Sequence, residues 1–279
     1  MIPKGELNEC DNIVKIEFTG ERVVPGKTPY TVYQEHINRY VFASKYIKNK
    51  IILDVASGTG YGSYYLIKNG AKKVIGVDIS SDAINYAKNV YKKQNLNFIQ
   101  GDSINLPFRD ESFDVITSFE TIEHIKEYDK FLKECRRVLK NDGLFICSTP
   151  NKKVYSPYAK LTLNPFHIKE FFPEEFYRIL NRHFRNTKLY GQKNVSLIKK
   201  RIFNIGKRVL SIIPKGEIIE RVIKKYINSN DKISNFNSNQ HNGKIKLIED
   251  IVDEDYKVSN FKDNKITTPA YIIAIGRKW

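Results

Sequence analysis

The stretch that decides the fold is Ile51-Ile-Leu-Asp-Val-Ala-Ser-Gly-Thr-Gly-Tyr-Gly62, an apolar run followed by closely spaced glycines. A short apolar run that leads into a glycine-rich turn is typical of a buried strand followed by a helix. Glycines at such a junction let the backbone come close to a ligand at the N-terminus of the helix. The stretch therefore predicts a strand over residues 51–55, a helix over 61–68 and a ligand-binding turn between them.

Strand and helix signals alternate from this stretch to about residue 150. Such alternation predicts an α/β fold in which a parallel sheet carries helices on both faces. Past residue 150 the pattern loosens, and Ala270–Ile275 is a strongly apolar strand candidate. The further strands predicted are 74–77, 96–100, 113–119, 144–148, 187–191 and 270–275, and the helices are 33–48, 81–94, 128–139 and 172–184. Residues 140–143, which include Gly143, are predicted to end the helix over 128–139.

Three acidic side chains lie at or just after the ends of the first three predicted strands, Asp54, Asp78 and Asp102 in that order. The glycine spacing is not that of dinucleotide-binding turns, and a pyrophosphate would meet the negative charge of Asp54. A carboxylate there suits a ligand that carries an ammonium and a sulfonium group. Asp78 can accept hydrogen bonds from both hydroxyls of a ribose, and Asp102, beside Ser103, from an adenine amino group. The pattern indicates a nucleoside cofactor.

This combination resembles the class I S-adenosylmethionine (SAM)-dependent methyltransferases, whose first motif is acid-x-Gly-x-Gly-x-Gly. Asp54, Gly58 and Gly60 match that motif, and Ala56 replaces its first glycine. The resemblance covers roughly residues 35–192. It implies SAM as the cofactor and a Rossmann-like, mostly parallel seven-stranded sheet whose last strand, near 270–276, is antiparallel. The cofactor-binding residues expected are Asp54, Ala56, Gly58, Gly60, Tyr61, Asp78, Ile79, Asp102, Ser103, Glu120 and Arg39.

A narrower resemblance rests on six short motifs that occur in a fixed order. The series resembles bacterial and archaeal methyltransferases encoded among surface-polysaccharide and glycosyltransferase genes, which implies O-methylation of a nucleotide-, lipid- or polysaccharide-linked sugar. The alternatives are another small molecule such as a quinone or lipid, a nucleic acid, and a SAM-binding module without activity. The motifs are Thr19–Gly26, Glu35–Tyr40, Ser118–His124, Ser148–Asn151, Asn164–Glu170 and Leu189–Gln192.

Catalytic candidates are expected where the predicted fourth and fifth strands end. Methyl transfer from a sulfonium needs mainly an acceptor held in line, and a hydroxyl acceptor gains from a general base. His124 is the first candidate base and His167 the second, since imidazole titrates near neutral pH. The competing roles are a helix cap or core-edge histidine for His124 and a loop lock for His167. Glu123 belongs to the same strand end, and Glu120 is expected to line the cofactor pocket.

The helix before the first strand is expected to form a lid over the cofactor. His36 and Arg39 share one face of it at i, i+3 spacing. Arg39 could pair with the methionyl carboxylate and His36 could touch the acceptor; the alternative is an ordinary surface face. No group of His, Cys and Asp has the sequence spacing of a metal site, so no metal is predicted, although carboxylates from distant segments could still meet.

The net charge of +16 is concentrated in one segment. Residues 193–227 hold ten Lys/Arg and two acids, hence +8, and their apolar residues form one helical stripe. A basic amphipathic helix can pack on the core, lie on an anionic membrane beside a lipid-linked substrate, or touch nucleic acid. Residues 228–243, with six Asn and three Ser, are expected to be a mobile loop. The Asn/Asp-Pro-Pro-Tyr motif that amino-methylating DNA enzymes carry after the fourth strand is absent after the predicted strand 113–119. This absence argues against a nucleic-acid acceptor.

These features divide the chain into four predicted parts: 1–48, an N-terminal arm and lid helix; 49–192, the SAM-binding core; 193–265, a basic helical insertion with its loop; and 266–279, the final strand of the core. Three scattered cysteines and no apolar run long enough to span a membrane predict a cytoplasmic protein, peripheral to the inner face of the membrane at most. The acceptor, the methylated atom and the oligomeric state are not determined by the sequence.

Overall fold

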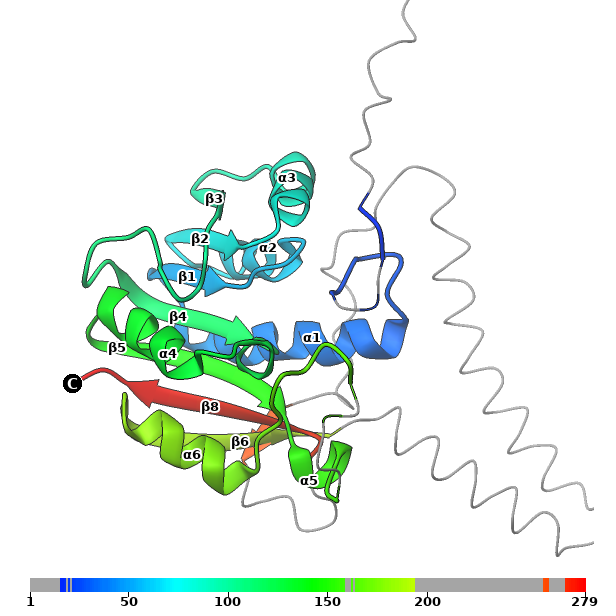
Figure 1. Ribbon diagram of the computed structural model, residues 1–279. Helices are drawn as coiled ribbons and strands as arrows, with labels where there is room; N and C mark the ends of the chain where they lie inside the picture. Colours follow the sequence, from blue (N-terminus) through cyan, green and yellow to red (C-terminus); the bar gives the residue numbers. More distant parts are fainter. Residues whose placement is uncertain are drawn as a thin grey trace, which may run out of the picture.

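The computed structural model describes residues 16–18, 20, 22–158, 162, 164–193, 258–260 and 269–279. In these residues eight strands form one sheet in the order β3-β2-β1-β4-β5-β8-β6-β7 (Figure 1). The strands are β1 (Ile51–Val55), β2 (Lys73–Asp78), β3 (Leu96–Gln100), β4 (Phe113–Phe119), β5 (Leu139–Pro150), β6 (Arg185–Gln192), β7 (Val258–Asn260) and β8 (Tyr271–Arg277). The helices are α1 (Tyr30–Ala43), α2 (Tyr61–Lys68), α3 (Ser81–Val90), α4 (Tyr128–Val138), α5 (Lys152–Tyr155) and α6 (Pro173–Asn181), with short 3₁₀ turns η1 (Ser44–Tyr46) and η2 (Ile122–His124).

The pairing of the strands confirms the predicted Rossmann-like fold. β1 to β5 are parallel to one another, so their carboxyl ends lie at one edge of the sheet. β8 is antiparallel to its neighbours, as predicted for the last strand, and it lies between β5 and β6. The three-residue β7 adds an outer strand beside β6, within the range that the sequence assigns to the insertion.

Helices cover both faces of the sheet because alternate strand residues are apolar on both sides. Ile52 packs into the hydrophobic cluster that holds side chains of α1, α2 and α3. Its neighbours Leu53 and Val55 pack into the opposite cluster, with side chains of α4 and α6. Figure 1 shows α4 and α6 on the near face and α1 on the far face. Parallel strands covered on both faces are near-continuous apolar runs, which is why the sequence pattern located them.

The predicted glycine stop after the helix over 128–139 is wrong. Helix α4 ends at Val138, and Leu139 is already extended, with φ −77° and ψ 135°. The chain enters β5 directly, and the pairing of β4 with β5 shifts register between Phe113 and Val115. In this irregular start Asp142, with φ 59°, takes the left-handed conformation, so Gly143 does not cap the helix.

Several predictions fall on residues that the structure does not describe. These are the amphipathic helix within 193–227, of which only Lys193 is described, the loop over 228–243, and most of the arm over residues 1–30. In the described part, no helix is both long enough and apolar enough to cross a lipid bilayer.

Candidate active site

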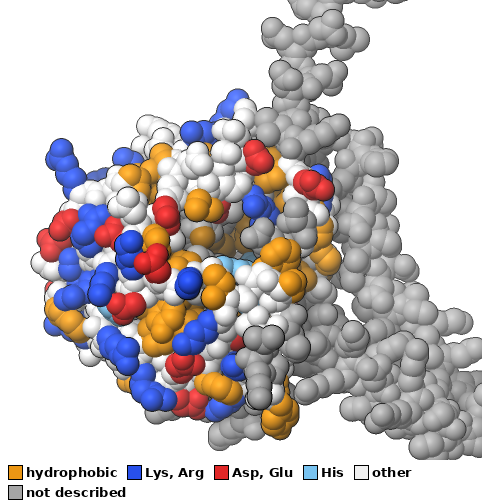
Figure 2. All heavy atoms as spheres, viewed as in Figure 1, with side chains coloured by type: hydrophobic (Ala, Val, Ile, Leu, Met, Phe, Trp, Pro, Cys, Tyr) orange, Lys and Arg blue, Asp and Glu red, His pale blue; other side chains and the backbone are white. Residues whose placement is uncertain are grey.

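A cavity of about 670 Å³ opens at the edge where β1, β2, β3, β4 and β5 end. Figure 2 shows the hollow in the middle of this face, with a histidine side chain inside it. The predicted site residues that line it are Ala56, Gly58, Tyr61, Asp78, Ile79, Asp102, Ser103, Glu120, Glu123, His124 and His167, together with His36. Asp54, Gly60 and Arg39 are not among the lining residues.

Asp78 is the best-organised acid of the cavity. Its Oδ2 accepts a hydrogen bond from the backbone N–H of Gly58 at 2.8 Å, and its Oδ1 accepts one from Ser80 N–H at 2.9 Å. A carboxylate oxygen can accept more than one bond, so both oxygens keep capacity for ligand hydroxyls. The bond from Gly58 also ties the glycine turn after β1 to the end of β2. The geometry fits the predicted ribose contact.

The loop after β3 supplies the next part of the wall. Asp102 is exposed, and its Oδ1 accepts from the N–H of Ile104 at 3.0 Å. Ile79 is 70% exposed on the cavity wall that also carries Asp78 and Asp102. An exposed apolar side chain in a lining that also holds two acids suits the flat face of a base, with acids available to its polar edges.

Asp54 lies beneath the glycine turn and is fully buried. Its carboxylate accepts hydrogen bonds from Ser63 Oγ at 2.6 Å, Thr117 Oγ1 at 2.8 Å and Tyr40 OH at 3.3 Å. Burial raises the pKa of Asp54 to about 6, and the three hydroxyl bonds oppose that shift. In this structure Asp54 joins β1, α1, α2 and β4 below the turn, and its contact with a ligand ammonium stays a prediction.

The turn after β1 uses left-handed backbone at three positions. Ala56, Gly58 and Gly60 have φ of 58°, 54° and 85°. A Cβ on Gly60 would lie 2.7 Å from Ala87 Cβ, whereas a Cβ on Gly58 would meet nothing within 4 Å. Gly60 is therefore required for packing against α3, and Gly58 borders open space. Ala56 bears the steric strain that a glycine would avoid.

Glu120 and Arg39 connect the cavity to helix α1, the predicted lid. Glu120 has a positive φ of 52°, and its Oε1 accepts from Ser148 Oγ at 2.6 Å. Arg39 is fully buried, with Nη2 3.7 Å from the same Oε1 and its guanidinium 4.2 Å from the centre of the Tyr271 ring. None of its three guanidinium nitrogens donates a hydrogen bond within the described residues. Its pairing with a methionyl carboxylate stays a prediction.

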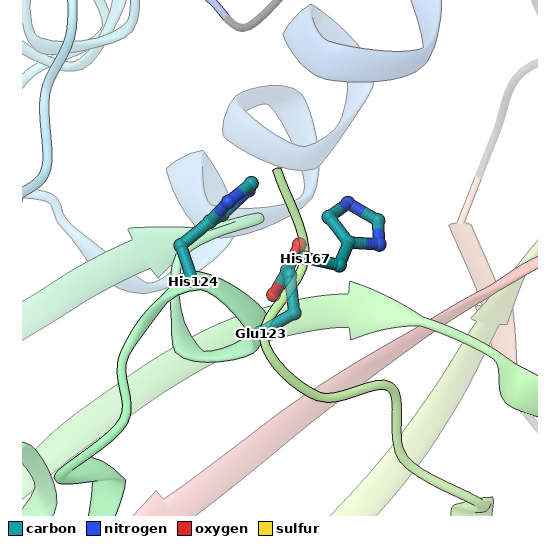
Figure 3. Close-up of side chains that lie close together, drawn as sticks. All are labelled: Glu123, His124 and His167. Carbon is teal, nitrogen blue, oxygen red and sulfur yellow. The ribbon is translucent and has the colours of Figure 1, made fainter. Parts of the chain in front are cut away.

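Glu123, His124 and His167 also line the cavity, and their side chains lie close together (Figure 3). One ligand atom of each side chain lies within 4.8 Å of the other two. The imidazole rings meet edge to face, with centroids 4.9 Å apart. Glu123 is fully buried, and burial, aided by the charge of Glu120, raises the pKa of its carboxyl well above the usual range.

Comparison with known proteins agrees with this geometry. The family model described as a methyltransferase domain matches residues 53–147. An S-adenosylmethionine-dependent methyltransferase of Mycolicibacterium smegmatis is 32% identical over 62% of this chain and 68% of its own length. The chain belongs to the SAM-dependent methyltransferases. A fatty-acid O-methyltransferase of the same organism is 31% identical, over 49% of this chain and 52% of its own.

Among solved structures, a SAM-dependent methyltransferase from Thermotoga maritima superposes with a TM-score of 0.55. It is 16% identical, and the match covers 89% of this chain and 91% of that one, which supports the fold alone. The methyltransferase family fixes SAM as the cofactor. Asp78, Ile79 and Asp102 offer hydroxyl acceptors, an apolar face and a base-edge acceptor, and so the described residues fit a nucleoside of this kind.

The sequence reasoning missed the groups that support His167. Glu170 Oε1 lies 2.9 Å from His167 Nδ1, and its Oε2 accepts from Ser156 Oγ. Asn164 Nδ2 lies 2.9 Å from His167 Nε2. Asn164, His167 and Glu170 repeat at steps of three within one motif, and that spacing was a usable signal for a histidine held from both sides.

Proposed function

We propose that this methyltransferase transfers a methyl group to an oxygen of a sugar or glycan acceptor carried on a lipid. The observation that carries the proposal is the second half of the cavity. Beyond the wall of Asp78 and Asp102, the same hollow continues to Glu120, Glu123, His124 and His167. Carboxylates and imidazoles are the side chains that hydrogen-bond and deprotonate a hydroxyl group.

SAM supplies an activated methyl group when it is bound, so the chain has to align the acceptor and take its proton. His124 Nδ1 lies 2.8 Å from the carbonyl oxygen of Phe166, which can only accept, so this nitrogen carries the ring proton. His167 Nδ1 faces Glu170 in the same manner. In the neutral rings Nε2 is then the basic nitrogen. In His167 this nitrogen faces Asn164 Nδ2 at 2.9 Å, so that amide has to turn away before the ring can take a proton.

Apolar side chains beside His167 support a lipid component. Phe166 and Ile168 flank it in the chain and are 42% and 57% exposed, and Phe166 also lines the cavity. Exposed large apolar residues at the rim of a polar site suit an acceptor with a polar and an apolar part. The similarity to a fatty-acid O-methyltransferase favours a second candidate, a lipid without a sugar.

The experiment is transfer of tritiated methyl from SAM into fractionated glycan, lipid and nucleic-acid pools, with Asp78→Ala as the inactive control. We expect label in the lipid-extractable fraction, which hydrolysis converts to a labelled sugar. Label that stays with a fatty acid supports the lipid candidate and overturns the sugar acceptor. Label only in nucleic acid overturns both.

The role predicted for residues 193–227 is a separate part of this proposal. We propose that this basic segment brings the enzyme to anionic membranes that carry the acceptor. Flotation of the full chain with anionic and neutral liposomes, with and without residues 193–227, tests it. We expect the deletion to abolish binding to the anionic vesicles, and unchanged flotation contradicts it.

A further inference from the structure

We propose that Glu123, His124 and His167 bind one divalent transition-metal ion at the acceptor end of the cavity. Two imidazoles and one carboxylate form a ligand set used by catalytic zinc and other first-row metal sites with open positions. Their ligand atoms all lie within 4.8 Å of one another. If each ligand atom bonds to one ion at about 2.0–2.2 Å, the ligand atoms lie about 3–3.5 Å from one another. Side-chain rotations that move each of these atoms by roughly 1 Å are enough to reach that arrangement.

A buried carboxylate oxygen without a partner is the independent sign of a cation. Glu123 is 0% exposed, and its Oε2 accepts from Thr149 Oγ1 at 3.0 Å. Its Oε1 is also buried and has no hydrogen-bond partner among the described residues. Leaving such an oxygen unpaired costs about 1–3 kcal/mol or more. Figure 3 shows the Glu123 carboxylate between the two imidazole rings, where a cation would restore that loss.

The two histidines are held as metal-binding histidines usually are. Such a histidine donates its second N–H to a carbonyl or a carboxylate, which fixes the ring and leaves the other nitrogen to the metal. His124 Nδ1–H donates to the Phe166 carbonyl at 2.8 Å, and His167 Nδ1 faces Glu170 Oε1 at 2.9 Å. Asn164 Nδ2 now donates to His167 Nε2, so this amide has to turn away when an ion binds.

The competing explanation is that the cluster only holds the loop over 164–170 in place. The backbone already does so, because Ile168 N–H and Lys169 N–H donate to the carbonyl oxygen of Glu123 at 2.8 and 3.0 Å. Those bonds need no carboxylate at position 123. A glutamine would also accept from Thr149, whereas it is a much poorer metal ligand, so Glu123→Gln separates the two explanations.

The role of the ion rests on the proposed O-methyl transfer, while its binding does not. Three protein ligands leave coordination positions for one or two acceptor hydroxyls, and a coordinated hydroxyl loses its proton more readily. The proton leaves to solvent, the alkoxide oxygen bonds to the methyl carbon, and the carbon–sulfur bond breaks to give a neutral thioether. His124 and His167 would then act as ligands and not as general bases.

The test measures binding of Mn²⁺ to the chelator-treated full chain by electron paramagnetic resonance. Zn²⁺ is then added to measure whether it displaces the bound Mn²⁺. We expect one ion per chain and at least about 10-fold weaker binding in Glu123→Gln, His124→Gln and His167→Gln. The matched control is His183→Gln, because His183 Nε2 pairs with Asp129 at 2.9 Å but does not line the cavity. Calorimetric SAM binding checks that each variant is folded.

Absence of bound Mn²⁺, or equal affinity in all four variants, overturns the site. Methyl transfer that survives complete chelation overturns the role of the ion even if the site binds Mn²⁺. Failure of the sugar acceptor in the transfer assay leaves the binding result unchanged, so the two proposals fail separately.

Discussion

The half of the cavity proposed to hold the cofactor and the half proposed to hold the acceptor are built in different ways. In the cofactor half, the Asp78 carboxylate is set by two backbone N–H groups, and Gly58 lies 20 residues before it on the neighbouring strand end. In the acceptor half, Glu123 and His124 from η2 meet His167 from a loop that docks through two backbone bonds. The first half therefore depends on strand order and turn geometry, and the second on the docking of one loop. If the two halves have these proposed roles, a change in that loop alters the acceptor side and leaves the residues proposed for the cofactor in place.

The largest expected effect tests whether the halves are independent. Asp78→Ala removes the proposed ribose acceptor and leaves the N–H groups of Gly58 and Ser80 without their partner. Hydrogen bonds to a charged group contribute about 1.5–3 kcal/mol each, so SAM affinity should fall more than about 100-fold by isothermal titration. His167→Gln should leave SAM affinity unchanged. A comparable loss in both variants would show that the halves are coupled.

The next prediction concerns the support beneath the cofactor half. The pKa of Asp54 is 3.8 ordinarily and about 6 in the fold, so between these values the folded state holds a proton that the unfolded state lacks. The unfolding free energy should therefore fall as pH rises from about 4 to about 6, by about 3 kcal/mol from this group. Asp54→Asn should flatten that fall in urea unfolding at several pH values. The exposed Asp82→Asn is the control, and an equal slope in wild type and Asp54→Asn would contradict the assignment.

A smaller effect should distinguish two glycines of one turn. Gly60→Ala places its methyl 2.7 Å from Ala87 Cβ and 2.8 Å from the Phe98 ring, whereas Gly58→Ala meets nothing. Both substitutions should lower the unfolding free energy by about 1–2 kcal/mol, because alanine is strained in left-handed backbone. Gly60→Ala should lower it by about 1–3 kcal/mol more, because its methyl group overpacks the core. Gly58→Ala should instead weaken SAM binding, since it lines the cavity. Urea unfolding and calorimetry measure the two effects, and the reverse order of stabilities would refute this account.

The smallest effect is a gain. Ala56 has a φ of 58° at the position where the family motif has glycine. Ala56→Gly relieves that strain, but the greater conformational entropy of glycine in the unfolded chain offsets part of the stabilisation. The unfolding free energy should therefore rise by roughly 0.5–1 kcal/mol. A loss of stability in this variant would mean that the methyl group of Ala56 packs usefully against the cavity wall.

The sequence located the strands well and the helix ends less well. Strands 51–55, 96–100 and 113–119 have the predicted bounds, because apolar runs between turn residues are a local signal. The helix over 81–94 ends instead at Val90, where Tyr91 leaves the helix and stacks on Tyr64 with centroids 5.0 Å apart. A tertiary contact of this kind has no trace in the periodicity.

The candidate site follows the same rule. Acids that follow successive parallel strands must meet at one edge, which is why Asp78 and Asp102 could be assigned together. Glu123 and His167 were singled out one by one, but their contact depends on how the loop over 164–170 docks. No local pattern encodes that docking, and so sequence spacing, from which no metal is predicted, carries no information on whether these side chains from distant segments meet.

The place of β8 in the sheet has a consequence for synthesis of the chain. β8 follows every other strand in the sequence, yet it lies between β5 and β6 and contributes Tyr271, whose OH donates to Glu35 of α1 at 2.7 Å and whose ring lies against Arg39. Pairs so distant in sequence form slowly, because a long loop has to close first. A nascent chain still lacking residues 271–277 would leave β5 and β6 unpaired on the side of the gap, open to chaperones or to the wrong partner. Helix α1 would gain this anchor only once these residues have left the ribosome.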